Sequence, residues 1–513
     1  MITESTLIEN RYFDSVFLMR VSKRLSEQPG INYAALIMGT PKNIQILADA
    51  GYDGIDGLGA SSNDLVVSLK ADSSDEARLV VDSLEQFLVR DSARPTTQTV
   101  RSLEQALTQQ PDSNIALVSV PGEFAAREAR QALQNGLNVF LFSDHVPVED
   151  ELSLKRLAME KGLLLMGPDC GTSIIGGVGL GFANAVRRGP VGVIGASGTG
   201  TQEVTSLIHR WGSGISHAIG VGGRDLSDDI GAISTRQAIN ALERDSDTEV
   251  ILLVSKPPGA ATTALVNERI AACSKPVVTC YLGSKEDEAP ISVNVTVVRN
   301  LDHAATSAIR LGGGIRVDEN SSVDIDTLER EAARLKPAQK FIRGVFSGGT
   351  LCYQAQQALR DTGLTVYSNE PLERGLKLPD SSSSIEHTLV DMGADEFTEG
   401  KPHPMVDSTQ RIQRILSEAN DPEVGVILLD CVLGYVAAED PAGDIAPAIS
   451  EAKRIARKRS EHLTIVASVC GTELDHQGLE AQVNVLEEAG AIVFTSGFQA
   501  ARFASGLVTG REE

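Results

Sequence analysis

Two glycine-rich turns of similar sequence are candidate anion sites. The first lies in Val191 to Glu203 (VGVIGASGTGTQE), where an apolar strand, a turn of small residues and the start of a helix follow one another. The second lies in Gly344 to Thr350 (GVFSGGT), and the helical pattern LCYQAQQAL follows it. The first turn of a helix has unpaired N–H groups and the positive end of the helix dipole, so glycines there let an anion approach closely. Two such helix ends could hold one phosphate from both sides.

The predicted phosphate-binding residues belong to these two turns: Ser197, Gly198, Thr199, Ser347, Gly348, Gly349 and Thr350. A single turn of this kind has a simpler explanation, namely a helix N-cap with glycines that allow tight packing. The repetition of the pattern favours an anion site over that alternative.

Three basic side chains are candidate catalytic residues. Lys256 follows an apolar strand and precedes two prolines, so it is either a point charge for a bound phosphate or a solvated lysine at a strand end. Arg224 of GVGGRD suits a bidentate contact with a carboxylate or phosphate, and its alternative is a turn with a surface ion pair. His403 lies between two prolines that restrict its backbone, which suits a positioned side chain, although histidine is also a common structural donor.

Other candidate residues follow apolar strands, at the sheet edge where ligands of parallel sheets bind. Cys170 is disfavoured as a nucleophile because no histidine is near it in sequence and a loop cysteine is often packed. The six cysteines show no CxxC or Cys/His pairing, so we predict no metal site and no disulfide framework. The predicted substrate-binding or CoA-binding residues are Phe142, Ser143, Asp144, Asp169, Cys170, Gly222, Gly223, Asp391, Asp430 and Gly434.

The composition is typical of an α/β protein. Of 513 residues, 42% are hydrophobic and 4% aromatic, and the net charge is -23. This charge disfavours nucleic acid and anionic membranes as partners, so an anionic ligand has to be held locally. We expect a cytoplasmic protein, because the N-terminus lacks the pattern of a signal peptide and no uncharged apolar run reaches about 18 residues.

The periodicity divides the chain into an N-terminal α+β unit and several α/β units. The N-terminal pattern predicts a ferredoxin-like or ACT-like fold, and a Rossmann-like unit of the CoA-binding type follows a polar linker at residues 91–98. Each glycine turn opens a flavodoxin-like unit with a parallel sheet, and a polar linker separates the two. The predicted ranges are 1–92, 99–186, 189–311, 312–339 for the second linker, and 340–513.

Several motifs in order resemble the succinyl-CoA synthetase and ATP-citrate lyase superfamily. Residues 115–311 resemble most of the α subunit, and residues 340–507 resemble the C-terminal ligase domain of the β subunit. VSKPP and GKPHPMVD resemble the FdrA-type branch, which is labelled acyl-CoA synthetase. The motifs shared with the α subunit are VPGEF at Val120, FSDHVP at Phe142, GPDCGTSI at Gly167, GVIGASGTGTQE at Gly192, GVGGRD at Gly220 and KPVV at Lys275.

The departures from this family bear on the chemistry. The resemblance implies a phosphate held between the two helix ends and a CoA contact at Phe142 to Asp144. In the ligases a histidine in a Gly-His-Ala-Gly loop carries the phosphoryl group, whereas here Gly283, Ser284, Lys285 and EDEAPISV follow the KPVV strand. The acid that supports this histidine aligns with Lys256, and no segment resembles an ATP-grasp domain. We therefore expect no phosphohistidine, and we expect phosphate as a substrate.

The resemblance implies a subunit of a larger enzyme. FdrA-type proteins are linked at family level with a multi-subunit oxamate (oxalurate) carbamoyltransferase of allantoin nitrogen catabolism. The expected reaction is attack of phosphate on the carbamoyl carbon of oxalurate, giving carbamoyl phosphate and oxamate. The alternatives are a CoA ligase whose partner supplies the histidine and the nucleotide domain, and a non-catalytic regulatory subunit. We expect an oligomer with other protein subunits in each case.

Overall fold

The computed structural model describes residues 2–13, 15–49, 51–52, 55–88, 100, 102–283, 292–314, 325–399 and 401–510. The linker expected at residues 91–98 and the histidine-free loop from residue 284 to 291 lie outside these ranges. The chain forms two compact units. The N-terminal unit comprises Met1–Asp112 and Ala394–Asp407, and the main unit comprises Ser113–Gly393 and Ser408–Glu513.

The N-terminal unit is an antiparallel sheet in the order β1-β3-β2, packed against helices. Leu18, Leu25, Leu65 and Leu69 belong to the core that joins the sheet to α1 and α3. The fold agrees with the predicted α+β type. Its elements are β1 (Ile2–Ile8), α1 (Ser15–Ser26), β2 (Ile31–Met38), α2 (Pro41–Asp49), η1 (Ile55–Leu58), β3 (Leu65–Ala71), α3 (Ser74–Leu88), α4 (Leu103–Gln109) and α13 (Asp395–Thr398).

A short parallel sheet opens the main unit. The βαβ pattern predicts this arrangement, because a helix connects each strand to the next. The sheet has the order β4-β5-β6, with β4 (Ile115–Val118), α5 (Gly122–Gln134), β5 (Asn138–Leu141), α6 (Val148–Lys161) and β6 (Leu165–Met166).

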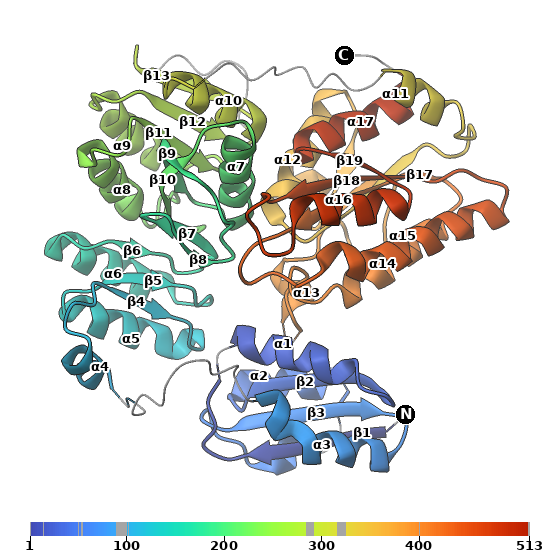
Figure 1. Cartoon of the computed structure of the whole chain (residues 1–513), viewed down its shortest axis with the longest axis horizontal. Helices are drawn as coiled ribbons and strands as arrows, with labels where there is room; N and C mark the ends of the chain where they lie inside the picture. The colour runs from blue at the N-terminus through green and yellow to red at the C-terminus, as the bar shows by residue number, and fades with distance from the viewer. Residues whose placement is uncertain are drawn as a thin grey trace. The chain divides into compact units, whose positions relative to one another are not determined.

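A seven-stranded sheet follows, in the order β13-β12-β11-β9-β10-β7-β8 (Figure 1). Helices α8 and α9 cover one face, and α7 and α10 cover the other. This double cover explains why β11 is buried at every position. The elements are β7 (Thr172–Ile175), β8 (Val178–Gly181), β9 (Arg188–Gly195), α7 (Gly198–Arg210), β10 (Ile215–Gly220), α8 (Ile233–Arg244), β11 (Val250–Ser255), α9 (Ala260–Ala271), β12 (Val277–Tyr281), β13 (Val295–Val298) and α10 (Leu301–Leu311).

The third sheet of the main unit has six parallel strands in the order β15-β16-β14-β17-β18-β19. Part of the segment expected as a linker is helical, since α11 lies within it and its Glu331 carboxylate is 2.7 Å from His462 Nε2. The elements are α11 (Ile325–Ala332), β14 (Phe341–Phe346), α12 (Gly349–Asp361), β15 (Val366–Tyr367), η2 (Arg374–Leu376), β16 (His387–Asp391), α14 (Thr409–Ala419), β17 (Val424–Val432), α15 (Pro441–Lys458), β18 (Thr464–Cys470), α16 (Leu479–Glu488), β19 (Ala491–Phe494) and α17 (Gly497–Thr509).

Both glycine turns follow the strand at which the strand order of their sheet reverses. β9 lies between β10 and β11, and β14 lies between β16 and β17. Ligands of open α/β sheets bind at such switch points, beyond the carboxyl ends of the strands. The topology therefore places both turns where ligand binding is expected.

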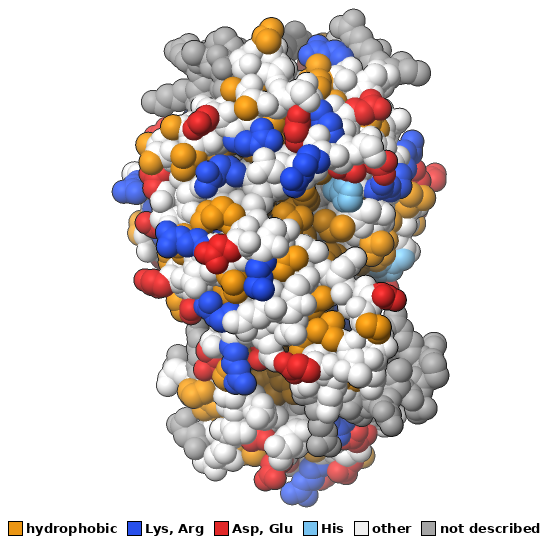
Figure 2. Space-filling model, turned by 90° about the vertical axis from the view of Figure 1, so that its left-hand side faces the viewer, with side chains coloured by type: hydrophobic (Ala, Val, Ile, Leu, Met, Phe, Trp, Pro, Cys, Tyr) orange, Lys and Arg blue, Asp and Glu red, His pale blue; other side chains and the backbone are white. Residues whose placement is uncertain are grey.

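The surface carries mixed charge on the face that Figure 2 presents, where Lys and Arg side chains are interspersed with acidic and apolar ones. Among the described residues, none of the helices has both the length and the apolar character of a membrane span. The same residues contain no group of three His, Cys, Asp or Glu that could hold a metal ion.

Candidate functional site

The first glycine turn, residues 195–200, connects β9 to α7. Ser197 caps the helix from an extended backbone, and its Oγ accepts a hydrogen bond from the Gly200 N–H at 3.2 Å. The Thr201 hydroxyl donates to the Ser197 carbonyl at 2.6 Å, which fixes the turn. The structure thus contains the N-cap of the simpler explanation, and an N-cap leaves other first-turn amides of a helix without intrahelical partners.

The second glycine turn, residues 347–350, connects β14 to α12, and a carboxylate of the chain occupies part of it. The Ser347 N–H and hydroxyl donate to Asp430 Oδ1 at 2.8 and 3.0 Å, and the Gly348 N–H donates to Asp430 Oδ2 at 2.8 Å. Arg411 in turn donates to Asp430 Oδ1 at 2.8 Å. These donors of Ser347 and Gly348 are therefore engaged internally, while Gly349 and Thr350 begin the helix beside them.

The structure brings the two turns into direct contact. The Ser197 and Thr350 hydroxyls hydrogen-bond to each other, and the Thr350 N–H donates to Thr199 Oγ1 at 3.3 Å. A methyl group placed on Gly200 would lie 2.9 Å from Thr350 Cγ2, which shows how closely α7 and α12 approach. Two helix N-termini and the hydroxyls of three residues thus meet at one place.

The carboxyl group of Asp391 also lies beside the second glycine turn. A methyl group on Gly349 would lie 2.5 Å from Asp391 Oδ2, so this carboxyl group sits against the first residue of α12. Burial raises the pKa of Asp391 to about 7, although the Gly393 N–H and the charge of Lys256 act in the opposite direction. The Lys256 ammonium lies 5.0 Å from the ring centroid of Tyr353, on α12. Lys256 and Asp391 therefore both flank the second turn.

The prediction from sequence missed Thr172, which lies in front of the first turn. A methyl group on Gly198 would be 3.6 Å from Thr172 Oγ1 and 4.0 Å from Gly171 Cα. Thr172 is 2% exposed, and no described residue bonds to its hydroxyl oxygen. An unsatisfied buried hydroxyl costs about 1–3 kcal/mol, so this oxygen suits a ligand at the helix end. Its signal in the sequence is its place in the motif GPDCGTSI.

The predicted CoA-binding residues form a second cluster of three loops. The Asp169 N–H donates to the Ser143 carbonyl at 2.9 Å, and a methyl group on Gly223 would be 3.8 Å from Asp169 Oδ2. The Ser143 hydroxyl donates to the Val120 carbonyl at 2.5 Å. Gly222 has a φ of +85° and packs against the Pro168 carbonyl, where a side chain would not fit. The loops are therefore held together largely by their own backbone.

Three other members of this cluster, Phe142, Asp144 and Cys170, have little chemical reactivity. The Phe142 ring stacks on Phe182 at a centroid distance of 5.9 Å, and Asp144 Oδ2 lies 3.4 Å from His145 Nε2. Cys170 is 3% exposed, and burial raises the pKa of its thiol to about 12. A neutral buried thiol is a poor nucleophile, in agreement with the interpretation of Cys170 as a packed residue. All six cysteines are buried and unpaired.

Arg224 belongs to a buried charge network that joins α6 to the loop after β10. Its Nη2 lies 2.9 Å from Glu151 Oε2, and the Lys155 ammonium lies 3.0 Å from Glu151 Oε1 and 2.6 Å from Asp225. Lys155, Glu151 and Asp225 are almost completely buried, whereas the Arg224 side chain is 43% exposed. The network gives Arg224 a structural role, and its catalytic role stays a prediction.

The two remaining candidate residues are His403 and Gly434. His403 belongs to the N-terminal unit, where its Nδ1 accepts a hydrogen bond from the Met405 N–H at 3.2 Å. Gly434 has a φ of +134°, and a methyl group there would be 2.7 Å from the Phe182 carbonyl oxygen. Packing of backbone against backbone thus explains this glycine.

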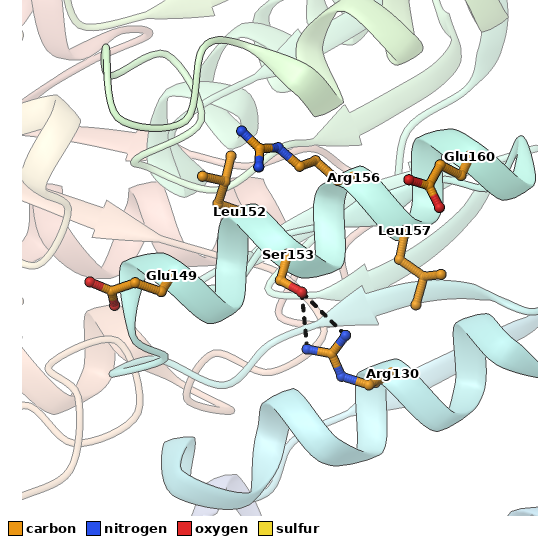
Figure 3. Close-up of a pocket in the computed structure, with 7 residues that line it drawn as sticks. All are labelled: Arg130, Glu149, Leu152, Ser153, Arg156, Leu157 and Glu160. Carbon is orange, nitrogen blue, oxygen red and sulfur yellow. Dashed lines mark hydrogen bonds between the residues drawn. The ribbon is translucent and has the colours of Figure 1, made fainter.

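A groove of about 430 Å³ lies between α5 and α6 (Figure 3). Arg130 of α5 donates to the Ser153 hydroxyl of α6 from both terminal nitrogens at 3.2 Å, which bridges the two helices. None of the predicted site residues lines this groove, so the contact between the glycine turns is the better candidate. The lining residues are Arg130, Glu149, Leu152, Ser153, Arg156, Leu157 and Glu160.

Comparison with protein families matches three parts of the chain. A model described as "AllF, heavy metal-associated domain" matches residues 1–106, one described as "CoA binding domain" matches residues 186–282, and one described as "CoA-ligase" matches residues 345–507. The two glycine turns lie in the second and third of these matches. The domain boundaries expected from the sequence stay predictions.

The chain is also similar to several known proteins. The uncharacterized protein YahF of Escherichia coli K12 is 46% identical over 494 residues, which are 95% of each chain. The α subunit of a succinate–CoA ligase of Aquifex aeolicus is 31% identical over 153 residues, 29% of this chain and 49% of that subunit, so the chain spans about half of it. ATP citrate lyase of Methanothrix soehngenii is 12% identical, with 80% of this chain and 84% of that chain covered; its TM-score of 0.36 is too low to carry an argument. The chain belongs to the succinyl-CoA synthetase and ATP-citrate lyase superfamily.

Proposed function

We propose that the chain is the phosphate-binding component of a carbamoyltransferase, in which phosphate binds where the two glycine turns meet. The observation that supports this proposal best is the contact of two helix N-termini through the hydroxyls of Ser197, Thr199 and Thr350. Hydroxyl groups and helix N-termini both donate to phosphate oxygens, and the dipoles of both helices favour the negative charge. A bound phosphate oxygen would replace the direct bond between Ser197 and Thr350 and accept from both.

Phosphate in this position would attack the carbamoyl carbon of oxalurate, and the products would be carbamoyl phosphate and oxamate. The helix dipoles stabilise the charge that develops on the attacked carbonyl and on the phosphate, and the ammonium of Lys256 adds a positive charge nearby. The assignment of this substrate follows from the resemblance to FdrA-type proteins. The Gly349 N–H and the Thr350 hydroxyl would be the donors of the second turn, because the N–H groups of Ser347 and Gly348 hold Asp430 and that of Thr350 bonds to Thr199.

A second candidate function is an acid–CoA ligase, which the matches to the CoA-binding and CoA-ligase models favour. CoA would supply the thiol that accepts the acyl group. The predicted CoA position offers the Phe142 ring for stacking, but its Ser143 hydroxyl is bonded internally to the Val120 carbonyl. These groups fit CoA less well than the two turns fit phosphate. A ligase of this kind would also need a partner with a nucleotide site.

The test is an assay of the complex obtained by co-purification with the tagged chain. One arm contains phosphate and oxalurate, and the other contains CoA, ATP and a carboxylic acid. Carbamoyl phosphate that depends on phosphate and not on CoA supports the transferase. Formation of a thioester in the second arm, without carbamoyl phosphate in the first, would contradict the transferase and support the ligase. No turnover in either arm would favour a regulatory subunit.

A further inference from the structure

Asp391 combines three features of a proton-transfer group. It ends β16, directly beside β14 and the second glycine turn, because Phe346 pairs with Asp391 in the parallel sheet. Its side chain is 8% exposed, and Oδ2 lies against Gly349, where α12 begins. Oδ1 accepts the Gly393 N–H at 2.9 Å, whereas no hydrogen bond from the described residues reaches Oδ2. One oxygen is therefore anchored and the other faces the helix end.

The backbone of Asp391 is held in place by one side chain. The amide group of Asn369 donates to the Asp391 carbonyl at 2.9 Å and accepts from the Asp391 N–H at 2.9 Å. Asn369 is 1% exposed, so this pair of hydrogen bonds is shielded from water. This pair of hydrogen bonds fixes the backbone from which the Asp391 side chain extends, and it uses neither carboxyl oxygen.

The proposed reaction needs a group that takes up a proton and returns it. A bond forms between a phosphate oxygen and the carbamoyl carbon, and the bond from this carbon to the oxamate nitrogen breaks. The electron pair of the broken bond stays on nitrogen, which must gain a proton, while hydrogen phosphate must lose one. The two changes cancel, so a single carboxylate that shuttles the proton balances the reaction, and no oxidant or reductant takes part.

We propose that Asp391 carries this proton, accepting it from hydrogen phosphate and passing it to the leaving oxamate nitrogen, with Asn369 as the residue that positions it. This inference rests on the proposed carbamoyl transfer. A group that titrates near neutral pH exchanges protons efficiently in both directions, and the raised pKa of Asp391 meets that requirement. The charged and titratable groups that face it are Lys256 after β11, Cys352 on α12, Glu370 after β15 and Asp430 on β17.

The experiment follows turnover by the purified complex from carbamoyl phosphate and oxamate. These two substrates do not titrate near neutral pH, so a change of turnover with pH in that region reflects a group of the protein. For the wild-type complex we expect turnover to fall below about pH 7, because Asp391 must be ionised to accept the proton of the attacking nitrogen. Asp391→Asn should lower turnover by about 10²–10⁴-fold and remove the fall of turnover below about pH 7. The control is Asp361→Asn, which changes a half-exposed carboxylate at the end of α12 and should leave both unchanged.

Two further measurements separate proton transfer from a structural role. Binding of inorganic phosphate to the Asp391→Asn complex should be unchanged or tighter, since a negative charge beside the anion is removed. Formate should restore part of the turnover of Asp391→Ala. An unchanged turnover and pH profile in Asp391→Asn would overturn the inference while the carbamoyl transfer stands, as would a loss of turnover that only mirrors a loss of phosphate binding. A wild-type complex that binds phosphate but forms no oxalurate and phosphate from these substrates would overturn both.

Discussion

Gly198→Ala separates the stability of the fold from the binding of phosphate. Gly198 is the first residue of α7, and the added methyl group would contact only Thr172 Oγ1 at 3.6 Å and Gly171 Cα at 4.0 Å within a 4 Å radius. Both are ordinary contact distances, so the fold accommodates the methyl group. Replacing glycine by alanine at a compatible backbone position stabilises a protein by about 0.4–1 kcal/mol.

The same methyl group stands between Thr172 and the end of the helix, where the phosphate is expected. A hydrogen bond to a charged group contributes about 1.5–3 kcal/mol, and the loss of one corresponds to about 10- to 150-fold weaker binding. The assay is calorimetric titration of the complex with inorganic phosphate, together with a thermal melt. Gly375→Ala is the matched control, because a methyl group there meets no atom within 4 Å. If Gly198→Ala melts like the wild type and binds phosphate equally well, phosphate does not bind at this helix end.

Three further predictions concern buried charged groups of the main unit, and the first two are paired with a control substitution. Asp430→Asn leaves the buried guanidinium of Arg411 without its counter-charge and should cost about 3–5 kcal/mol in urea unfolding, whereas Asp361→Asn, with a partly exposed partner, should cost under about 1 kcal/mol. Lys155→Met should also cost about 3–5 kcal/mol, and Arg224→Gln clearly less, because Lys155 is the cation buried between two carboxylates. Burial raises the pKa of Asp302 to about 7, so its folded form keeps a proton that the unfolded chain loses near pH 4, and stability from this group falls as the pH rises from about 4 to 7. The unfolding free energy of Asp302→Asn relative to the wild type should therefore grow over that range by on the order of 4 kcal/mol, and a constant difference would contradict the assigned pKa.

The strand, turn and helix at each glycine turn could be predicted from local patterns, whereas the expectation that the two turns meet came from their repetition and from the family resemblance. An apolar strand, small residues and an amphipathic helix recur at both turns, so their similar local structure was visible in the sequence. Pro41 at the first position of α2 likewise marks a helix start. These signals depend on neighbours along the chain, and single sequences carry them well.

The partners within the site depend on strand register, which the sequence does not carry. Asp430 reaches Ser347 because Val345 pairs with Leu429 across two adjacent parallel strands, 84 residues apart in sequence. In the same way, the pairing of β14 with β16 brings Asp391 beside the start of α12. For this reason Asp430 was expected to bind a ligand, and the structure instead shows it bonded to the backbone of the second turn.

The measurement that tests the central claim most directly follows the phosphorus atom. The wild-type complex is incubated with oxalurate and ³²P-labelled phosphate and then divided. One half is quenched in alkali, which preserves any phosphohistidine on the protein, and the other half is chilled at neutral pH and analysed at once for labelled carbamoyl phosphate, which decomposes in alkali. We predict that the label enters carbamoyl phosphate and that this chain stays unlabelled, because phosphate reacts directly between the two glycine turns. Label bound to this chain, or the absence of labelled carbamoyl phosphate, would contradict the account.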